Sequence, residues 1–349
     1  DVGFMPASVR RLPMLEIAKW RSNPDAFADE LRHAAHTIGF FQVRHTAPAA
    51  AKRALDAAAA FFALPLHCKR EISYLRSPAF RGFMDLGVEN TQGVPDMREQ
   101  IEIGAEEPQS SPRALPPYER LRGPNQWPEA LPELRSALDT YATHMLGLSR
   151  EITSAMCAAL RLPAGALDPL FLSGAHWQMK ATHYVVGDSP EGVGDSALGV
   201  GAHADSGFLT MLVQDADGLQ VQTGGEWIDV PPAGPDVVVC NLGEVAEMVS
   251  GGFLLATPHR VLSRKRLSLP FFYNPALSAH VQALALSADL QWKRPPEQSK
   301  KHWRASANAH LTQFGMNAFK SLARSHPEVM RRHHPDLHVH EDGQVTVRA

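Results

Sequence analysis

His203 and Asp205 stand two residues apart in the stretch GVGAHADSG, residues 199–207. Side chains at positions i and i+2 of a strand share one face. Strand-like runs, ALGVGA and FLTMLV, flank the pair, so we expect both side chains to point into a barrel. A buried carboxylate is costly unless a partner or a metal compensates it. The pair is therefore a candidate metal site, with a hydrogen-bonded His–Asp pair at a sheet end as the structural alternative.

A second histidine and an Arg-x-Ser pattern follow downstream, in TPHRVLSRKRLSLP. His259 lies far enough from Asp205 for several strands to return the chain to the same barrel end. Two imidazoles and one carboxylate on one side of a metal form the facial triad that suits non-haem Fe(II) and leaves positions open. Arg266 and Ser268 share a strand face, and a guanidinium beside a hydroxyl is a good receptor for a carboxylate.

Another His-x-Asp pattern, His334-Pro335-Asp336, lies near the C-terminal end of the sequence. It follows a charged helical stretch and has proline at its centre. We expect this pattern and the neighbouring histidines to form a solvated tail that binds metal weakly at most.

Composition limits the classes of function. The 349 residues are 44% hydrophobic and 20% charged, which is typical of a globular protein. A net charge of -3 gives no electrostatic reason to expect a nucleic-acid or membrane partner, and the sequence predicts neither. Three widely spaced cysteines indicate free thiols in a reducing compartment, and no long apolar run or signal peptide is evident. We therefore expect a cytoplasmic protein, whose oligomeric state the sequence leaves open.

The elements that must position these residues can be read from the hydrophobic pattern. We expect helices over residues 25–37, 47–64 and 133–162, the last with a possible break at Gly147, and a buried strand at GFFQV. Residues 104–132 read as a long surface loop. Many short strands follow between residues 179 and 275, which favours a sandwich or barrel over βαβ units. Helical character returns at 302–332, and the tail reads as a hairpin around Asp342-Gly343.

The order HAD, PHRV and RLS resembles the 2-oxoglutarate/Fe(II)-dependent dioxygenases of the isopenicillin N synthase-like superfamily. GFFQV, FFALP, RGF, GPNQWP and NLGE extend the resemblance over most of the chain. It implies a mainly β fold with flanking helices and a double-stranded β-helix (jelly roll) core. It also implies one domain, 1–349, with an N-terminal helical and strand cap (1–130), a jelly-roll core with the metal site (175–280) and a C-terminal helical segment (300–335).

The resemblance also implies roles for single residues. Fe(II) would be held by His203, Asp205 and His259, and the distal carboxylate of the cosubstrate 2-oxoglutarate by Arg266, Ser268 and Tyr184. Thr182 replaces an asparagine that helps to position 2-oxoglutarate in many plant relatives. The implied reaction consumes O2 and releases succinate and CO2 while a small-molecule metabolite is hydroxylated, desaturated or cyclised.

Candidate substrate contacts come from segments that often line the pocket in this family. Lys180 could meet an acidic substrate, or it could be a strand-end lysine that reaches water. The other candidates, for which plain structural roles are the alternative, are Arg81, Phe83, Glu99 and Phe314. His183 alternates with Tyr184, so we expect it to face away from the iron.

Two other functions remain open from the sequence. One is a related Fe(II) oxidase that uses the same triad without 2-oxoglutarate. The other is a non-catalytic jelly-roll protein that only binds a ligand. The three metal-binding candidates together with Arg266, Ser268 and Tyr184 argue against the second.

Overall fold

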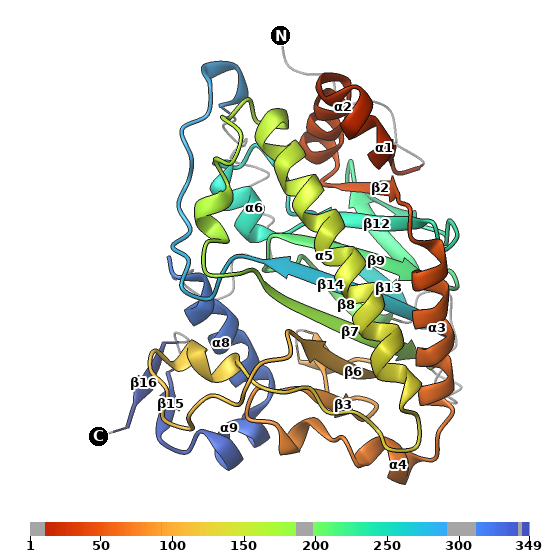
Figure 1. Ribbon diagram of the computed structural model, residues 1–349, viewed down its shortest axis with the longest axis vertical. Coiled ribbons are helices and arrows are strands. Elements are labelled where there is room, and N and C mark those ends of the chain that lie inside the picture. Colours follow the sequence, from red (N-terminus) through yellow and green to blue (C-terminus); the bar gives the residue numbers. More distant parts are fainter. Residues whose placement is uncertain (1–10, 92, 186–197, 292–311, 341–343, 349) are drawn as a thin grey trace.

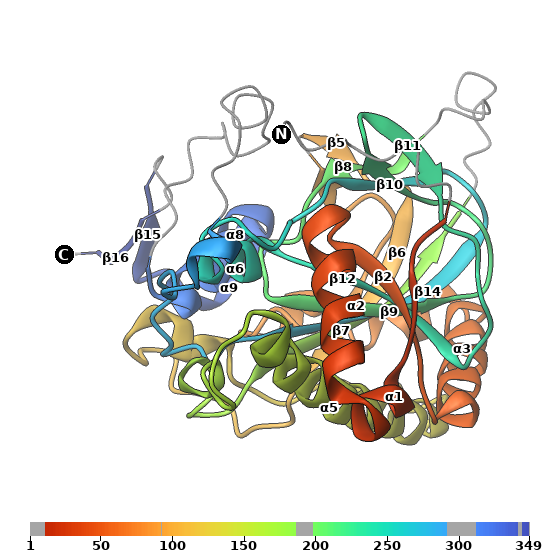
Figure 2. The same ribbon diagram turned by 90° about the horizontal axis from the view of Figure 1, so that it is seen from above.

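The computed structural model describes residues 11–91, 93–185, 198–291, 312–340 and 344–348. Two β-sheets face each other (Figures 1 and 2). The strands of the large sheet, in sheet order, are β1 (Met14–Glu16), β2 (Phe40–Arg44), β12 (Val237–Leu242), β9 (Leu209–Gln214), β14 (Arg266–Asn274), β7 (His176–Tyr184), β6 (Arg98–Gly104) and β3 (Gly82–Met84). Those of the small sheet are β11 (Glu226–Asp229), β10 (Leu219–Thr223), β13 (His259–Leu262) and β8 (Leu198–His203).

One apolar cluster fills the space between the two sheets. Its residues from the large sheet include Phe40, Tyr184 and Leu212, and those from the small sheet include Val200 and Val261. The large-sheet positions alternate along their strands with residues that belong to a second, larger core under the helices. Strand alternation therefore directs one set of side chains into the barrel and the other set toward the helices.

Helices cover the outer face of the large sheet. The long helix α5 (Glu133–Ala159) crosses it diagonally, and α2 (Pro24–Thr37) and α3 (Pro48–Phe62) pack beside α5 (Figure 1). The buried side of α5 includes Leu134, Leu138, Tyr141 and Met145, spaced three or four residues apart as one helix face requires. Two shorter helices precede α2 and follow α3, namely α1 (Ile17–Ser22) and α4 (Leu66–Arg70).

The remaining elements lie around the ends of the barrel. The helices are α6 (Glu244–Val249), α8 (Phe314–Ser325) and α9 (Pro327–His333), and the strands β4 (Asn90–Thr91), β5 (Val94–Pro95), β15 (Leu337–Val339) and β16 (Val345–Val347) form two small hairpins. No helix in the described part of the chain is long and apolar enough to cross a membrane.

The mainly β fold with flanking helices that the sequence predicts is confirmed. Helix α5 runs through Gly147 without the possible break that the sequence indicates. No neighbouring atom of the described residues packs where a Cβ of residue 147 would lie, so no contact bends the helix there. In the predicted helical stretch 302–332, residues 302–311 lie outside the described residues, and the rest forms α8 and α9. The tail pairs as a β15–β16 hairpin, whose predicted turn at Asp342-Gly343 is also outside the described residues.

The expectation of a solvated tail is wrong for the second His-x-Asp pattern. His334 is buried, stacks on Phe80 and hydrogen-bonds through Nε2 to the carbonyl of Pro78. Both carboxylate oxygens of Asp336 accept hydrogen bonds from the buried Arg120, at 2.8 and 2.7 Å. The pattern therefore anchors the C-terminal segment to the loop before α5, a long-range contact that the local sequence does not reveal.

Candidate active site

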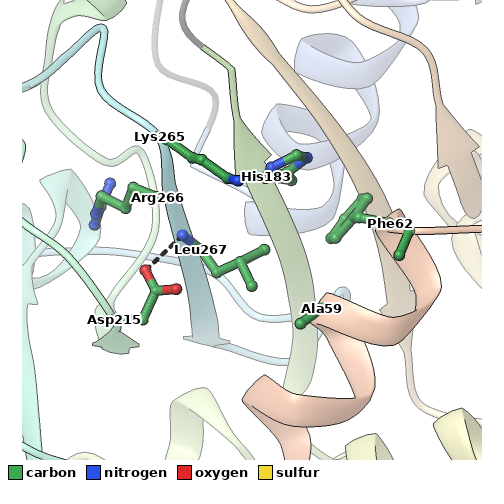
Figure 3. A pocket seen from close by; sticks show the side chains of 8 residues that line it. Ala59, Phe62, His183, Asp215, Lys265, Arg266 and Leu267 are labelled. Atoms are coloured by element: carbon green, nitrogen blue, oxygen red, sulfur yellow. Dashed lines mark hydrogen bonds between the residues drawn. The ribbon is translucent and has the colours of Figure 1, made fainter.

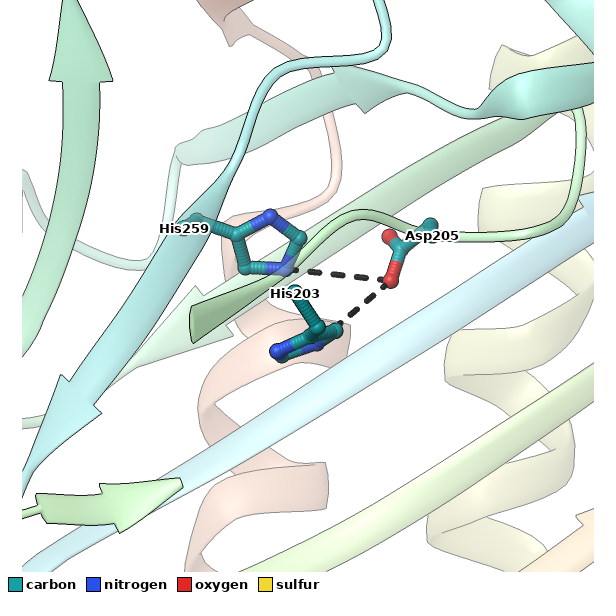
Figure 4. Close-up of side chains that lie close together, drawn as sticks. All are labelled: His203, Asp205 and His259. Carbon is teal, nitrogen blue, oxygen red and sulfur yellow. Dashed lines mark ion pairs between the residues drawn. The ribbon is translucent and has the colours of Figure 1, made fainter. Parts of the chain in front are cut away.

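His203, Asp205 and His259 meet at one end of the barrel (Figure 4). β8 and β13 are antiparallel neighbours that place His203 directly opposite His259, and Asp205 follows β8 by two residues. The Nε2 atoms of the two histidines lie 3.8 and 3.7 Å from Oδ1 of Asp205. One ligand atom from each of the three residues lies within 4.8 Å of the others, close enough for a single ion to touch all three.

Hydrogen bonds to the protein backbone orient the two imidazole rings, so that their Nε2 atoms face Asp205. Nδ1 of His203 is 2.9 Å from the carbonyl oxygen of Gly201, and Nδ1 of His259 is 3.2 Å from that of Thr257. A carbonyl can only accept, so each Nδ1 must carry a proton, and in the neutral imidazole Nε2 then carries the lone pair. This arrangement is the usual outer support of histidine metal ligands.

Asp205 is oriented by two neighbours. Its Oδ2 accepts hydrogen bonds from Thr210 Oγ1 at 2.5 Å and from Asn241 Nδ2 at 2.7 Å. These bonds come from β9 and β12 and leave Oδ1 directed toward the imidazoles. Sequence reasoning missed both residues, because their contact with Asp205 depends on how distant strands pair.

The electrostatics of the cluster favour the protonation states that a metal requires. Partial burial, and then the neighbouring His259, lower the pKa of His203 to about 4. Burial alone would raise the pKa of Asp205, but the two imidazoles and the bonds from Asn241 and Thr210 outweigh it and lower that pKa. Two neutral imidazoles and a carboxylate are the donor set of a divalent cation, so these residues fit Fe(II).

Arg266 begins β14 and points into the barrel. It is buried, its Nη2 donates to Oε1 of Gln214 at 2.6 Å, and its guanidinium lies 5.0 Å from the ring centre of Tyr184. Its Nε and Nη1 have no hydrogen-bond partner among the described residues. Burial lowers the pKa of the Arg266 guanidinium, although nearby Tyr184 and Asp215 oppose that effect. A buried cation with two unused donors is a fitting receptor for a carboxylate.

The other predicted cosubstrate residues surround Arg266. In the register of β7 with β14, Tyr184 lies opposite Arg266 and Thr182 lies opposite Ser268. Both Thr182 and Ser268 are buried, and the Thr182 hydroxyl has no hydrogen-bond partner among the described residues. The structure thus brings Arg266, Ser268, Tyr184 and Thr182 together on the interior face of adjacent strands.

Sequence reasoning missed Arg98, the first residue of β6. The register of β6 with β7 places it opposite Tyr184, on the same interior face. Tyr184 therefore stands between Arg98 on one side and Arg266 on the other. The alternating polar pattern R-x-Q-x-E of β6 was a signal for this face, although its partner strand could not be read from the sequence.

Two predicted substrate residues lie on the other face of the large sheet. Glu99 accepts hydrogen bonds from Lys69 Nζ at 2.6 Å and from His183 Nδ1 at 2.9 Å. Phe83 packs edge-on against Phe61 in the helix-covered core. The structure does not bring these residues to the triad, because strand alternation turns them toward α3.

A surface hollow lies on that outer face, between α3 and the ends of β7 and β14 (Figure 3). Phe62, His183 and Leu267 are among its lining residues. Arg266 also lines the hollow, although Figure 3 shows its side chain extending away from Phe62, His183 and Leu267. His183 therefore lies outside the site, as its alternation with Tyr184 predicts.

The remaining substrate candidates have structural contacts. Arg81 Nη1 donates to the carbonyls of Ala105 and Gly123, so this buried arginine ties down the loop before α5. Phe314 begins α8 and is buried in the helix-covered core. Lys180 does face the barrel interior, but its Nζ lies 3.3 Å from Glu89 Oε1 and 3.4 Å from Glu102 Oε2. An acidic substrate would have to compete with these two carboxylates.

Comparison with known proteins identifies this arrangement. Residues 177–275 match the family described as the 2OG-Fe(II) oxygenase superfamily, and residues 12–130 match the N-terminal region described for a non-haem dioxygenase in morphine synthesis. A 2-oxoglutarate-dependent dioxygenase of Gibberella zeae is 31% identical over 90% of this chain and 88% of its own length. A homoarginine-6-hydroxylase of Glycine max is 32% identical over 84% of this chain and 89% of its own length.

The fold agrees with a solved structure of this group. The crystal structure of a full-length Neurospora crassa protein in complex with alpha-KG superposes with a TM-score of 0.72 at 22% identity, over 92% of this chain and 98% of that one. The jelly-roll core, the enzymatic function and the cofactors Fe(II), 2-oxoglutarate and O2 that the sequence predicts are thereby confirmed. The chain belongs to the 2OG-Fe(II) oxygenase superfamily, as an Fe(II)- and 2-oxoglutarate-dependent dioxygenase.

Proposed function

We propose that His203, Asp205 and His259 hold the catalytic Fe(II) through Nε2, Oδ1 and Nε2. The proposal is supported by the distances of 3.7 and 3.8 Å between these atoms and by the protonation that the carbonyls of Gly201 and Thr257 impose. An ion held by these three residues alone would remain open to 2-oxoglutarate and O2. The His203 side chain is 35% exposed to solvent, which agrees with a metal position that small molecules can reach.

Arg266 binds the distal carboxylate of 2-oxoglutarate in this proposal, through the unused Nε and Nη1. Ser268, Tyr184 and Thr182 line the same part of the interior and offer hydroxyl groups to the cosubstrate. Gln214 fixes the guanidinium from the opposite side, because its Oε1 accepts from Nη2. The observation that supports this role most strongly is the pair of unpartnered donors on a fully enclosed arginine.

The protein's own contribution to the reaction is geometry. Oxidative decarboxylation of 2-oxoglutarate at the bound Fe(II) consumes O2, releases succinate and CO2, and supplies the oxidising power for a substrate C–H bond. Thr210 and Asn241 keep the Asp205 carboxylate ionised and oriented. Phe40 packs edge-on against the His259 ring and excludes water from that side.

The substrate in this proposal is a small organic metabolite. Support comes from the Glycine max relative, whose name gives homoarginine as its substrate. A net charge of -3 offers no attraction to nucleic acid or to an anionic membrane. Three free cysteines, two of them buried, support a reducing, cytoplasmic location.

We propose two further features of the enzyme. The enzyme is of the isopenicillin N synthase-like type, which the order of HAD, PHRV and RLS supports. It works as one domain, 1–349, with residues 1–130 as a helical and strand cap region, 175–280 as the jelly-roll core and 300–335 as a C-terminal helical segment, of which 300–311 lie outside the described residues. The matched ranges 12–130 and 177–275 support the first two of these regions.

The test is coupled turnover. Purified protein with Fe(II) and 2-oxoglutarate should release one succinate for each product molecule when a panel of metabolites is supplied. Product without succinate would identify an oxidase that does not use 2-oxoglutarate. An intact protein that releases neither and takes up no Fe(II) without oxygen would refute the site assignment.

A further inference from the structure

A row of charged and amide side chains lines the barrel interior beyond Tyr184. In the register of β6 with β7, Gln100 lies opposite Thr182 and Glu102 lies opposite Lys180, on the same interior face as Arg98. Glu89 reaches this row from the loop before β4, where its Oε1 accepts from Gln100 Nε2 at 3.0 Å. We call these five residues, Glu89, Arg98, Gln100, Glu102 and Lys180, the inner polar cluster.

The inner polar cluster adjoins the strand that bears His203. The β4–β5 hairpin packs on β8 so closely that a side chain at Gly201 would meet Thr91 at 2.9 Å. The backbone N–H of Met97 donates to the carbonyl of Gly199, which joins the start of β6 to β8. The β4–β5 hairpin and the start of β6, which adjoin the cluster, therefore contact the strand that bears His203.

The cluster borders accessible space although it points inward. The side chains of Lys180, Glu89 and Arg98 are 18%, 13% and 14% exposed to solvent. His326, at the start of α9, approaches from the C-terminal segment, where its Nε2 lies 3.4 Å from Glu89 Oε1. Lys180, Glu89 and Arg98 are therefore partly accessible although they face inward, whereas Glu102 and Gln100 beside them are buried.

The two cations of the cluster are already neutralised. Lys180 lies between Glu89 and Glu102, at 3.3 and 3.4 Å. Arg98 Nη2 is 3.0 Å from Asp96 Oδ2 and 3.6 Å from Glu89 Oε2. A carboxylate ligand would have to displace these anions, so the cluster is poorly suited to an acidic substrate.

Unused hydrogen-bond acceptors remain. Glu102 and Gln100 are each 1% exposed, yet Oε2 of Glu102, despite its ion pair with Lys180, and Oε1 of Gln100 accept no hydrogen bond from the described residues. Oδ2 of Asp96, which forms an ion pair with Arg98, is a third such acceptor. Buried acceptors without donors are costly, and N–H groups of a ligand would satisfy them. A positively charged N–H donor would form the stronger, charge-assisted hydrogen bond with the Glu102 carboxylate.

We propose that the inner polar cluster is the subsite for the primary substrate and that it binds a cationic nitrogen, an ammonium or a guanidinium, through Glu102 and Gln100. This inference rests on the proposed function, since it places the substrate in the same barrel as the triad. A cationic group held there leaves the rest of the molecule beside the β8 strand, next to His203. Lys180 and Glu89 set the charge of the subsite and do not themselves bind the cation.

The test uses full-length protein loaded with Fe(II) and 2-oxoglutarate without oxygen. Two matched pairs of probes differ in charge at similar shape, L-arginine with L-citrulline and cadaverine with 1,5-pentanediol. Calorimetry should show that the charged member of at least one pair binds about tenfold or more tightly than its neutral partner. Equal binding of both members in both pairs, or no binding of either cation, would overturn the proposal.

Three variants make the result specific. Glu102→Gln should reduce the preference for the charged probe about tenfold. Lys180→Met should increase it, because the carboxylates lose their internal cation. Glu99→Gln is the matched control, a carboxylate change on the same strand but on the helix-covered face, and should leave the preference unchanged. Loss of the preference in Glu99→Gln, or an opposite sign for Lys180→Met, would contradict the assignment.

Two controls separate the possible failures. Thermal melting shows whether each variant folds, and if Glu102→Gln does not, the sign of the Lys180→Met effect decides. The dissociation constant of 2-oxoglutarate is measured in the same samples. Normal 2-oxoglutarate binding without a preference for cations refutes the substrate subsite alone, whereas absent 2-oxoglutarate binding refutes the proposed function of the site.

Discussion

Arg266 and Tyr184 lie directly opposite each other on β14 and β7, with the guanidinium 5.0 Å from the centre of the tyrosine ring. The ring covers one side of the arginine, and Gln214 accepts one of its N–H groups. The guanidinium is thereby fixed before any ligand arrives, with Nε and Nη1 left as donors. A preorganised donor pair loses little conformational entropy when a carboxylate binds.

Arg266→Ala should weaken 2-oxoglutarate binding strongly. The change removes two charge-assisted hydrogen bonds and leaves the distal carboxylate buried without its cation, a loss of about 2–4 kcal/mol. Calorimetric titration of the Fe(II)-loaded protein with 2-oxoglutarate measures it. Arg260→Ala, which removes an arginine stacked on Trp227 in the small sheet, is the control and should bind 2-oxoglutarate normally. Unchanged affinity in Arg266→Ala would remove Arg266 from the cosubstrate site.

Thr210→Val and Asn241→Leu should weaken metal binding without preventing folding. Each removes one hydrogen bond to Oδ2 of Asp205, and loss of such an outer partner typically costs about 10–100-fold in metal affinity. Fe(II) titration without oxygen gives the affinity. Thr140→Ala, whose exposed hydroxyl bonds only within α5, provides the control. Wild-type affinity in both site variants would mean that Asp205 needs no such support.

Glu99→Gln should destabilise the fold without affecting the reaction. Lys69 Nζ, which is buried, would lose its charged partner, which costs about 2 kcal/mol. Burial alone would raise the pKa of Glu99, but the bonds from His183 and Lys69 outweigh it and lower that pKa. A lowered pKa means that this stability is present above the ordinary glutamate pKa and is lost as the pH falls through the lowered one.

Melting temperatures measured as a function of pH test the predicted role of Glu99. The difference in melting temperature between wild type and Glu99→Gln should be largest near neutral pH and should shrink on acidification below the ordinary glutamate pKa. A difference that stays constant, or grows, down to acidic pH would show that the Glu99 carboxylate does not stabilise the folded state as an anion.

The convergence of His203, Asp205 and His259 could be predicted from the sequence because most of its signals are local. His203 with Asp205, and Arg266 with Ser268, are i, i+2 pairs, and strand alternation alone places each pair on one face. The inner polar cluster was missed because its meaning depends on pairing. Gln100 and Glu102 become neighbours of Thr182 and Lys180 only through the β6–β7 register.

The same limit explains the residues that lie elsewhere. Glu99 and Phe83 belong to segments near the site, but the phase of β6 and β3 turns them toward the helices. His334 and Asp336 resemble a polar tail until Phe80 and Arg120, far away in the sequence, come to pack on them. Alternation within a strand can be read from the sequence, whereas the partner of each face is set by tertiary contacts.

The number of Fe(II) ions bound by Asp205→Ala, compared with wild type, tests the central claim most directly. Equilibrium dialysis without oxygen should give one Fe(II) for each wild-type chain. Asp205→Ala should lose that ion while its melting curve still shows a folded protein, and His33→Ala, an exposed histidine on α2, should keep it. A folded Asp205→Ala protein that binds one Fe(II) with wild-type affinity would contradict the assignment of His203, Asp205 and His259 as the metal centre.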